Sequence, residues 1–194
     1  MLDVAEAHFA RKGYEGAHLE SIASEVGVRK TALYYYFESK SALYGAVLER
    51  MIAEFDHIVV AVLDRVDTDP VRRLEELVDG IDDLLTRRPS YSQILMRIFV
   101  DRIPVDDSIL TPTMQRAIGR VMKFYKEGVA SGSFRKLSAR HFLLNVLGMM
   151  LFYYAGGEST AAMLDVEDLF SQDAIRWRRD QFREMLLRGV LPGS

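Results

Sequence analysis

Apolar residues recur at helical spacing along almost the whole chain, and the alternation typical of strands is rare. The longest regular run follows Ser39, with steps of three or four between its apolar residues: Leu43, Val47, Met51, Phe55, Ile58, Val62 and Val66. This spacing places them on one face of a single long helix. Ser39 would cap that helix, because its hydroxyl can accept a hydrogen bond from a free backbone N–H. The pattern predicts an all-α fold.

Three shorter helices are predicted before the long one, and glycines separate them. Gly13 ends the first and Gly27 ends the second, since glycine commonly follows the last turn of a helix. The third begins near Lys30 and carries Leu33 and Phe37 on one face. These helices would form a compact head, which the long helix joins to a body without a flexible Gly/Ser linker. The expected domain bounds are 1–45 for the head and 46–194 for the body.

Five further helices are predicted in the body, giving nine in chain order. Asp69 and Pro70 mark the start of the fifth, because proline is favoured in the first helical turn. The fifth to ninth helices are expected at about residues 70–88, 91–103, 114–130, 138–155 and 173–189. Residues 104–112 are expected to form a loop. Residues 158–172 would be a connector with a short helix near Val166–Phe170.

Composition narrows the class of protein. The 194 residues include no cysteine, which excludes disulfides, thiolate nucleophiles and cysteine-ligated metals. The chain has no run of about 18 apolar residues that could span a membrane, and Asp3 and Glu6 interrupt the first apolar stretch, which argues against a signal peptide. We therefore expect a cytoplasmic protein without a membrane partner. The net charge of −3 gives no global positive field, so a nucleic-acid site would have to be local.

The second and third predicted helices have the spacing of a helix-turn-helix unit, with Gly27 in the tight turn. In such a unit the second helix enters the major groove of DNA with its N-terminal residues. Lys30 and Thr31 lie at that end, where lysine can donate to guanine and the threonine methyl can contact thymine. Residues 34–36 are three tyrosines, which cannot all be buried on so short a helix. Some of their hydroxyls must point outward, and Lys40 suits a phosphate contact.

A purely structural interpretation of the same pattern stays open at this point. Helix pairs with a glycine turn also occur in all-α proteins that bind no DNA, and three tyrosines can form a packed cluster. Residues 1–50 contain six Lys or Arg and seven Asp or Glu, which argues against a generally basic surface. The periodicity alone therefore leaves DNA binding undecided.

Three blocks of sequence give a more specific signal. They read FARKGYEG at residues 9–16, IASEVGV at 22–28 and LYYYFESKSAL at 33–43. In this order and spacing they closely resemble the TetR family of bacterial transcriptional regulators, over about residues 2–47. The resemblance implies an all-α homodimer whose head binds double-stranded DNA and whose body holds a small-molecule pocket.

The resemblance also implies which residues of the head touch DNA. Base or groove-phosphate contacts fall on Lys30, Thr31, Tyr34 and Tyr35, backbone contacts on Tyr36 and Lys40, and a variable base-reading position on Arg29. His18 stands where the family often has threonine, so it is a poorer N-cap and only partly replaces the phosphate contact. Glu20 stands where some members have a basic base-reading residue, so that contact is not expected here.

The eighth predicted helix is apolar on nearly every side over residues 141–154, so it must be covered on every side. Gly148 would permit the close approach of another helix. A central position within one chain would satisfy this pattern, but the resemblance favours a homodimer through the eighth and ninth helices. The arginines of the ninth helix are expected to form a solvated face or the rim of that interface.

The body is rich in methionine and aromatic residues, which suit a pocket for an apolar ligand and equally suit an ordinary core. The resemblance favours the pocket. The expected ligand-binding residues are Phe55, Tyr91, Phe99, Met122, Tyr125, His141, Leu147 and Leu151.

No enzyme signature accompanies these features. The four histidines have no metal-ligand spacing, and the sequence contains no Gly-rich phosphate loop or serine elbow. We therefore expect no catalytic activity, no cofactor and no metal. The favoured interpretation is a one-component repressor, released from a pseudo-palindromic operator by a small apolar effector. The alternative is an all-α small-molecule-binding or scaffold protein without operator recognition.

Overall fold

The computed structural model describes residues 1–65, 69–100 and 112–193. These residues form helices and contain no strand, so the predicted all-α fold is confirmed. The helices are α1 (Leu2–Gly16), α2 (Leu19–Val26), α3 (Lys30–Tyr36), α4 (Lys40–Leu63), α5 (Pro70–Arg87), α6 (Pro89–Val100), α7 (Pro112–Ala130), α8 (Ala139–Ala155), α9 (Glu158–Leu164) and α10 (Gln172–Val190). The predicted eighth and ninth helices correspond to α8 and α10.

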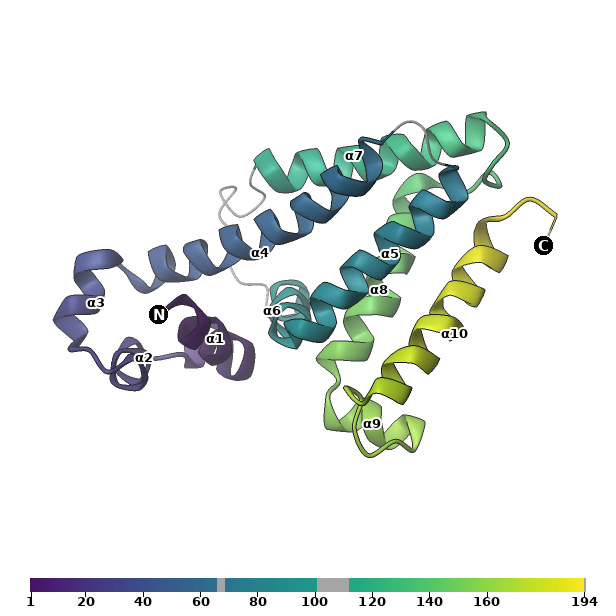
Figure 1. Ribbon diagram of the computed structural model, residues 1–194. Coiled ribbons are helices and arrows are strands. Elements are labelled where there is room, and N and C mark those ends of the chain that lie inside the picture. The colour runs from purple at the N-terminus through teal and green to yellow at the C-terminus, as the bar shows by residue number, and fades with distance from the viewer. Residues whose placement is uncertain (66–68, 101–111, 194) are drawn as a thin grey trace.

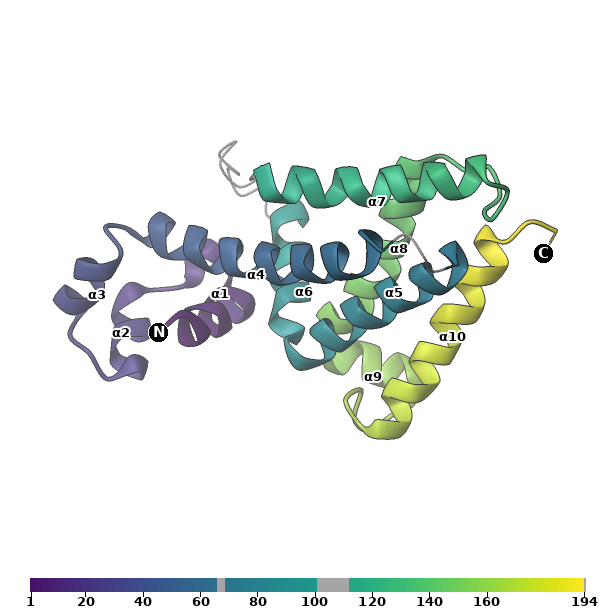
Figure 2. The same cartoon turned by 45° about the horizontal axis from the view of Figure 1, so that its top comes forward.

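Helices α1–α3 form a small head at one end of an elongated molecule (Figure 1). Helix α4 leaves the head and crosses the body, with α7 alongside it in both views (Figures 1 and 2). Helices α5, α8 and α10 run side by side through the rest of the body, and α6 packs between α1 and α8. The head therefore contacts the body through α6 as well as through α4.

Helix α4 follows the predicted apolar stripe. Leu43, Val47 and Met51 are almost completely buried, and the next members of the stripe are half-buried. Ser39 caps the helix as expected, since its Oγ accepts a hydrogen bond of 3.0 Å from the N–H of Ala42. The helix ends at Leu63, and the last predicted member of the stripe lies outside the described residues, as does the predicted loop at 104–112.

One predicted boundary is confirmed and another needs correction. Gly13 leaves helical backbone at φ 71° and ψ 176°, as a helix stop there requires, and one further turn follows it to Gly16. The short helix expected near Val166–Phe170 lies earlier, at Glu158–Leu164. Asp165 ends that helix in the left-handed conformation at φ 54°, and its N–H bonds back to the last turn. Aspartate tolerates this conformation better than most residues, so the chain turns away before the predicted segment.

One cluster of buried apolar side chains runs from the head into the body. Arg97 of α6 reinforces this contact, because its guanidinium donates to the backbone carbonyls of Ala10 and Arg11, each at 2.9 Å. Those carbonyls lie just before the interruption of α1, where helical partners are lost. Among the helices of the described ranges, none is both long and apolar enough to cross a membrane.

Candidate nucleic-acid interface

A tight left-handed turn at Gly27 sets the angle between α2 and α3. Gly27 has φ 79° and ψ 25°, a conformation that an L side chain adopts only with strain. Its N–H bonds to Ser24 and the N–H of Val28 bonds to Ala23, at 3.1 and 2.9 Å. These bonds satisfy the last carbonyls of α2 as a helix C-cap requires. The turn predicted from the sequence is therefore present, and it joins α2 and α3 as in a helix-turn-helix unit.

Helix α3 is held to the head by a single fully buried side chain. Leu33 is 0% exposed and belongs to the same core as Ile22 of α2, and Phe37 packs against that core after the helix ends. Both were predicted to lie on one face of this segment. Arg29, at the N-cap of α3, and Lys30 and Thr31 in its first turn are exposed, so the first turn is open to a partner.

The three consecutive tyrosines lie on the outer side of α3. Tyr34, Tyr35 and Tyr36 are 42%, 86% and 67% exposed, which confirms that they are not a buried cluster. The rings of Tyr35 and Tyr36 meet edge to face at 5.3 Å. Such rings can contact sugar and thymine methyl groups, while their hydroxyls bond to phosphate.

Lys30 is held in place by two neighbours. Its Nζ forms an ion pair with the carboxylate of Glu20 in α2 and lies 5.7 Å from the centre of the Tyr34 ring. The hydrogen bond to Glu20 raises the pKa of Lys30, and the same bond lowers the pKa of Glu20. Both groups are therefore charged near neutral pH. The sequence could not predict this pair, because the two residues lie ten positions apart on different helices.

Lys40 and His18 flank α3 and α2. Lys40 Nζ donates to the backbone carbonyl of Glu15 at 3.0 Å and lies 4.7 Å from the centre of the Tyr14 ring. An ammonium has three donors, so this bond leaves capacity for a phosphate. His18 is the N-cap of α2 and makes no side-chain capping bond, which agrees with its expected weakness as a cap. Its imidazole is exposed beside the first turn of α2.

The body places the predicted ligand-binding residues in several environments. Phe55 and Tyr91 adjoin, with ring centres 6.1 Å apart. Tyr91 is fully buried, and its hydroxyl donates to Glu54 Oε1 at 2.7 Å. Burial, and then the bond to Glu54, raise the pKa of Tyr91 well above its usual range. The hydroxyl therefore stays protonated and keeps donating.

Tyr125 belongs to a different aromatic cluster. Its ring stacks on Phe142 at 4.2 Å and on Phe134 at 5.6 Å, and its hydroxyl donates to the carbonyl of Arg135 at 3.0 Å. Gly128 approaches Phe134 so closely that a Cβ there would clash with the ring. The surroundings of Tyr125 are thus filled by its own neighbours.

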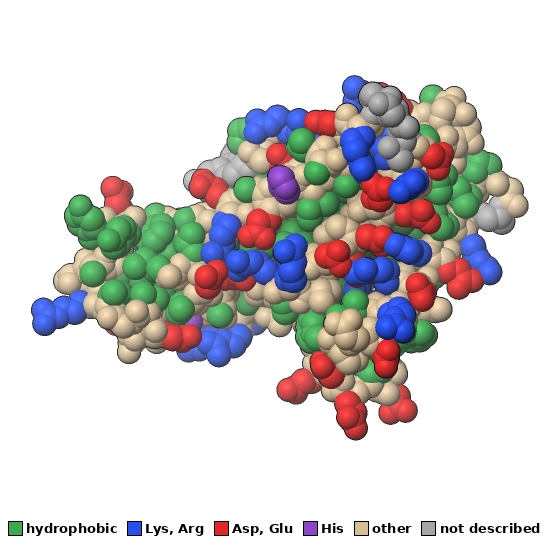
Figure 3. Space-filling view, in the orientation of Figure 1, with side chains coloured by type: hydrophobic (Ala, Val, Ile, Leu, Met, Phe, Trp, Pro, Cys, Tyr) green, Lys and Arg blue, Asp and Glu red, His purple; other side chains and the backbone are tan. Residues whose placement is uncertain are grey.

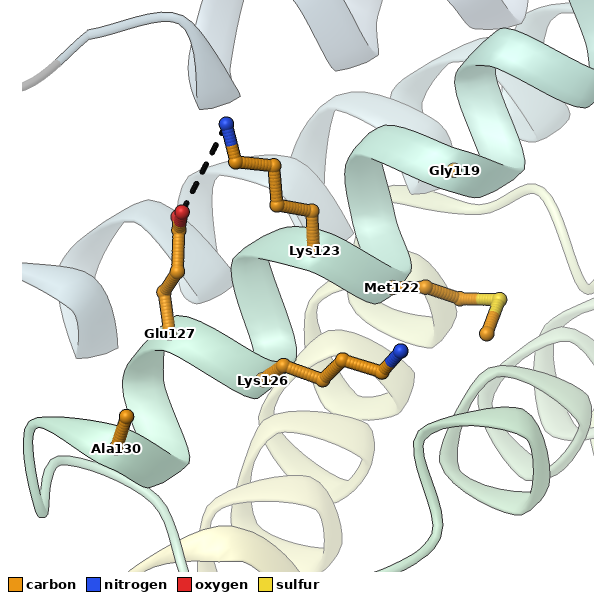
Figure 4. Close-up of a pocket in the computed structure, with 6 residues that line it drawn as sticks. All are labelled: Gly119, Met122, Lys123, Lys126, Glu127 and Ala130. Atoms are coloured by element: carbon orange, nitrogen blue, oxygen red, sulfur yellow. Dashed lines mark ion pairs between the residues drawn. The ribbon is translucent and has the colours of Figure 1, made fainter.

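The remaining predicted ligand-binding residues differ widely in their exposure. Met122 lines a hollow of about 400 Å³ on α7, and Figure 4 shows its side chain projecting to the same side as Lys126. Phe99 is 65% exposed and His141 is exposed, whereas Leu151 is buried and Leu147 half-buried. These eight residues do not together enclose one cavity in this structure, and ligand contact at them stays a prediction.

A polar hollow of about 340 Å³ lies where the head meets the body. Glu6 of α1 is only 4% exposed there and accepts bonds from Arg50, Arg88 and Ser90. The Arg88 guanidinium also lies 3.7 Å from the carboxylate of Glu54. Figure 3 shows Lys/Arg and Asp/Glu side chains gathered in this region. Sequence reasoning missed the cluster, because its members come from four separate segments.

The arginines of α10 correct another expectation. Arg178 is buried against the buried Asp82 of α5, and its guanidinium stacks over Tyr154 at 4.5 Å. Arg179 also binds Asp82, and Arg183 pairs with Asp79. These side chains tie α10 to α5 within one chain, so they are not merely a solvated face.

An apolar groove lies between α8, α9 and α10. It encloses about 430 Å³, and its walls include Gly148, Phe152, Trp177 and Met185. Phe152 is 59% exposed, Trp177 49% and Met185 64%. The groove therefore exposes several large apolar side chains side by side.

Helices α2 and α3 are joined by a glycine turn, and α3 exposes basic and aromatic residues. This unit is attached to an all-α body. Together these features define a DNA-binding protein of the helix-turn-helix class. Residues 1–47 match the family model described as bacterial regulatory proteins, tetR family. Over these residues, the head of the chain matches the TetR family of regulators.

Comparisons over the full length extend the likeness to the body. The chain is 27% identical over 194 residues to the HTH-type transcriptional repressor NicS of Pseudomonas putida, covering 98% of this chain and 90% of that protein. A putative fatty acid metabolism regulator of Clostridium perfringens has the same fold, with a TM-score of 0.80 at 18% identity over 98% of both chains. AibR, solved with isovaleryl coenzyme A and operator DNA, matches with a TM-score of 0.74 at 18% identity, covering 95% of this chain and 94% of AibR.

Proposed function

We propose that the chain is a one-component DNA-binding transcriptional regulator, a repressor that leaves its operator when a small apolar molecule binds the body. The observation that carries this proposal is that α3 has one buried side and one exposed side. Leu33 fixes one side in the head core, while Lys30, Thr31 and the three tyrosines face solvent at the end of the molecule. The family match of the head and the repressor relative support the same function.

The proposed DNA-contacting residues divide into two groups by the part of the DNA that each would contact. Arg29, Lys30 and Thr31, together with Tyr34 and Tyr35, lie where a recognition helix reads base edges. Tyr36, Lys40 and His18 lie around them, where contacts to phosphate fix the register on the duplex. Operator binding would place the protein in the cytoplasm, with the bacterial chromosome.

Selection of the purified full-length chain against random duplex DNA tests this function. We expect enrichment of a pseudo-palindromic site whose half-sites lie about one helical turn, roughly 34–36 Å, or somewhat more apart. Binding that falls with salt but shows no sequence preference would instead support the alternative, an all-α protein without operator recognition.

A homodimer through α8 and α10 would cover the apolar groove. Phe152, Trp177 and Met185 are about half exposed or more in one chain, and Gly148 in the same groove leaves open space for a neighbouring helix. A second copy related by a twofold axis would place the same groove against itself. Light scattering at micromolar concentration should then give twice the mass of one chain.

A small apolar effector would bind near the Phe55 and Tyr91 pair. This part of the body offers two adjoining aromatic rings and a buried hydroxyl already oriented by Glu54, a combination that suits an apolar molecule with one polar group. AibR shows that this fold accommodates isovaleryl coenzyme A together with operator DNA. A thermal-shift screen of apolar acids and acyl thioesters should identify a stabilising compound, and that compound should weaken operator binding.

A further inference from the structure

The ion pair between Glu20 and Lys30 joins the two helices of the helix-turn-helix unit on their exposed side. Glu20 is the second residue of α2 and Lys30 the first residue of α3. Their side chains are 63% and 43% exposed. An exposed ion pair adds little to the stability of a fold. The turn at Gly27 and the burial of Leu33 already fix the two helices, so the pair is not needed for that purpose.

A carboxylate is an unusual group on a surface that meets DNA. It repels the phosphate backbone, and on nonspecific DNA it neutralises the charge of Lys30, so fewer counterions are released on binding. Lys40, by contrast, donates to the backbone carbonyl of Glu15 rather than to a carboxylate. Glu20 therefore lowers general affinity for DNA, and any gain it provides must come from contact with particular bases.

Base edges in the major groove supply that contact. Guanine presents two acceptors, O6 and N7, to which lysine donates, whereas cytosine presents the N4 amino group, from which glutamate accepts. The Glu20–Lys30 pair places one acceptor beside one donor. Tyr34 limits the freedom of Lys30 from the other side, 5.7 Å from its Nζ. The two charged groups would thus reach the DNA together. Their acceptor and donor are complementary to the donor of cytosine and the acceptors of guanine, in one G·C pair or in adjacent G and C.

We propose that Glu20 is a specificity-determining residue, which accepts a hydrogen bond from cytosine N4 while Lys30 donates to the guanine paired with that cytosine or next to it. Where thymine O4 or guanine O6 faces Glu20, two acceptors oppose each other and binding weakens. This inference rests on the proposed operator recognition.

The test is a parallel selection on random duplex DNA with the full-length wild type, Glu20→Gln, Glu20→Ala and Lys30→Ala. Glu49→Gln is the matched control, because it removes the same charge from an exposed position on α4. The wild type should enrich cytosine beside the guanine that Lys30→Ala ceases to select. Glu20→Gln should change the preference from cytosine toward adenine, since an amide pairs with adenine N6 and N7. Glu20→Ala should reduce the preference for cytosine about tenfold, which is the effect of losing one good base contact.

A second measurement separates base contact from simple charge. Both Glu20 variants should bind nonspecific duplex more tightly than wild type, with a salt slope steeper by about one unit. Melting temperatures should match that of wild type, because the side chain is exposed. An unchanged motif with Glu20→Gln, when the wild type does enrich a site, overturns the inference and leaves the proposed function standing. If the Glu20 variants lost only the preference for guanine, the inference would also be overturned, since Glu20 would then merely orient Lys30. A wild type that enriches no site refutes operator recognition and this inference together.

Discussion

Tyr91 and Glu54 share a hydrogen bond of 2.7 Å inside the body, and the carboxylate of Glu54 also lies 3.7 Å from the guanidinium of Arg88. Arg88 in turn bonds to Glu6 of the head at 3.1 Å. Three consecutive polar contacts therefore connect the aromatic interior of the body to the first helix of the head. A change in the position of Tyr91 would reach the head through groups that touch one another.

Tyr91→Phe tests this connection. Removing the hydroxyl leaves Glu54 short of a donor and should cost about 1 kcal/mol of unfolding free energy, measured by denaturant unfolding. Operator affinity of the ligand-free protein should also change severalfold. Tyr125→Phe is the control, because its hydroxyl bonds to a backbone carbonyl elsewhere in the body. It should lose similar stability and leave operator affinity as it was. Equal effects on DNA binding from both variants would refute the connection.

Glu6→Gln should destabilise the protein strongly. Glu6 is 4% exposed and faces the guanidinium groups of Arg50 and Arg88, and breaking a buried ion pair by removing one partner costs roughly 3–5 kcal/mol. Thermal unfolding followed by circular dichroism measures the loss. Glu49→Gln on the exposed side of α4 should change stability by no more than about 0.5 kcal/mol. A loss below 1 kcal/mol for Glu6→Gln would show that the cluster does not hold the head.

Phe152→Glu and Trp177→Glu should separate the proposed dimer. Both side chains are largely exposed in one chain, so the substitutions spare its core, whereas a charge at Met150, only 2% exposed, would disrupt the fold itself. Sedimentation velocity should show folded monomers. Leu137→Glu, an exposed apolar site that is not among the residues of the groove, should remain dimeric. Dimers that survive both groove variants would place the interface elsewhere.

Lys40→Ala and Lys30→Ala should weaken DNA binding in different ways. Loss of a phosphate contact at Lys40 lowers affinity for all sequences and reduces the salt slope by about one unit. Loss of a base contact at Lys30 should cost about 1–3 kcal/mol on the selected site and relax one base position. Titrations at several salt concentrations measure both. Lys126→Ala on α7 serves as the control and should behave as wild type. Unchanged operator affinity in both head variants would refute the assignment of α3.

Two glycine substitutions should change stability in opposite directions. Gly27→Ala puts a Cβ into left-handed backbone and should cost roughly 1–2 kcal/mol. Gly45→Ala lies inside α4 with open space around the new Cβ, and alanine should gain up to about 1 kcal/mol there. Chemical denaturation of both variants measures the difference. A stable Gly27→Ala protein would mean that the turn between α2 and α3 can adopt another conformation.

Features set by neighbours in sequence could be predicted, and those set by distant partners could not. Ser39, Gly27 and the stripe on α4 act through residues within a few positions of themselves, so their roles follow from spacing. Glu6 and Asp82 find their partners 44 to 97 positions away, and no local pattern distinguishes such carboxylates from exposed ones. The resemblance of the head marked α3 as the recognition helix, but it gave no sign that Glu20 would pair with Lys30.

The body was harder to predict for a related reason. Tyr91 and Tyr125 are both buried aromatic residues on helices, and sequence reasoning grouped them in one pocket. Their rings belong to separate aromatic groups, because Tyr91 of α6 meets Phe55 of α4 whereas Tyr125 of α7 meets Phe142 of α8. The arrangement of the helices, rather than residue type, decides which rings meet.

The length of helix α4 would convert a small tilt at its body end into a larger displacement of the head. Its 24 residues span about 36 Å at a rise of 1.5 Å per residue. A tilt of about 5° at its body end would move the other end by about 3 Å, close to the rise of one base pair along DNA. In a twofold dimer both heads would move, so their separation would change by up to twice that distance. An effector that shifts α4 by about 1 Å at Phe55, which lies about 12 Å from the body end of the helix, would therefore put the two recognition helices out of step with successive major grooves.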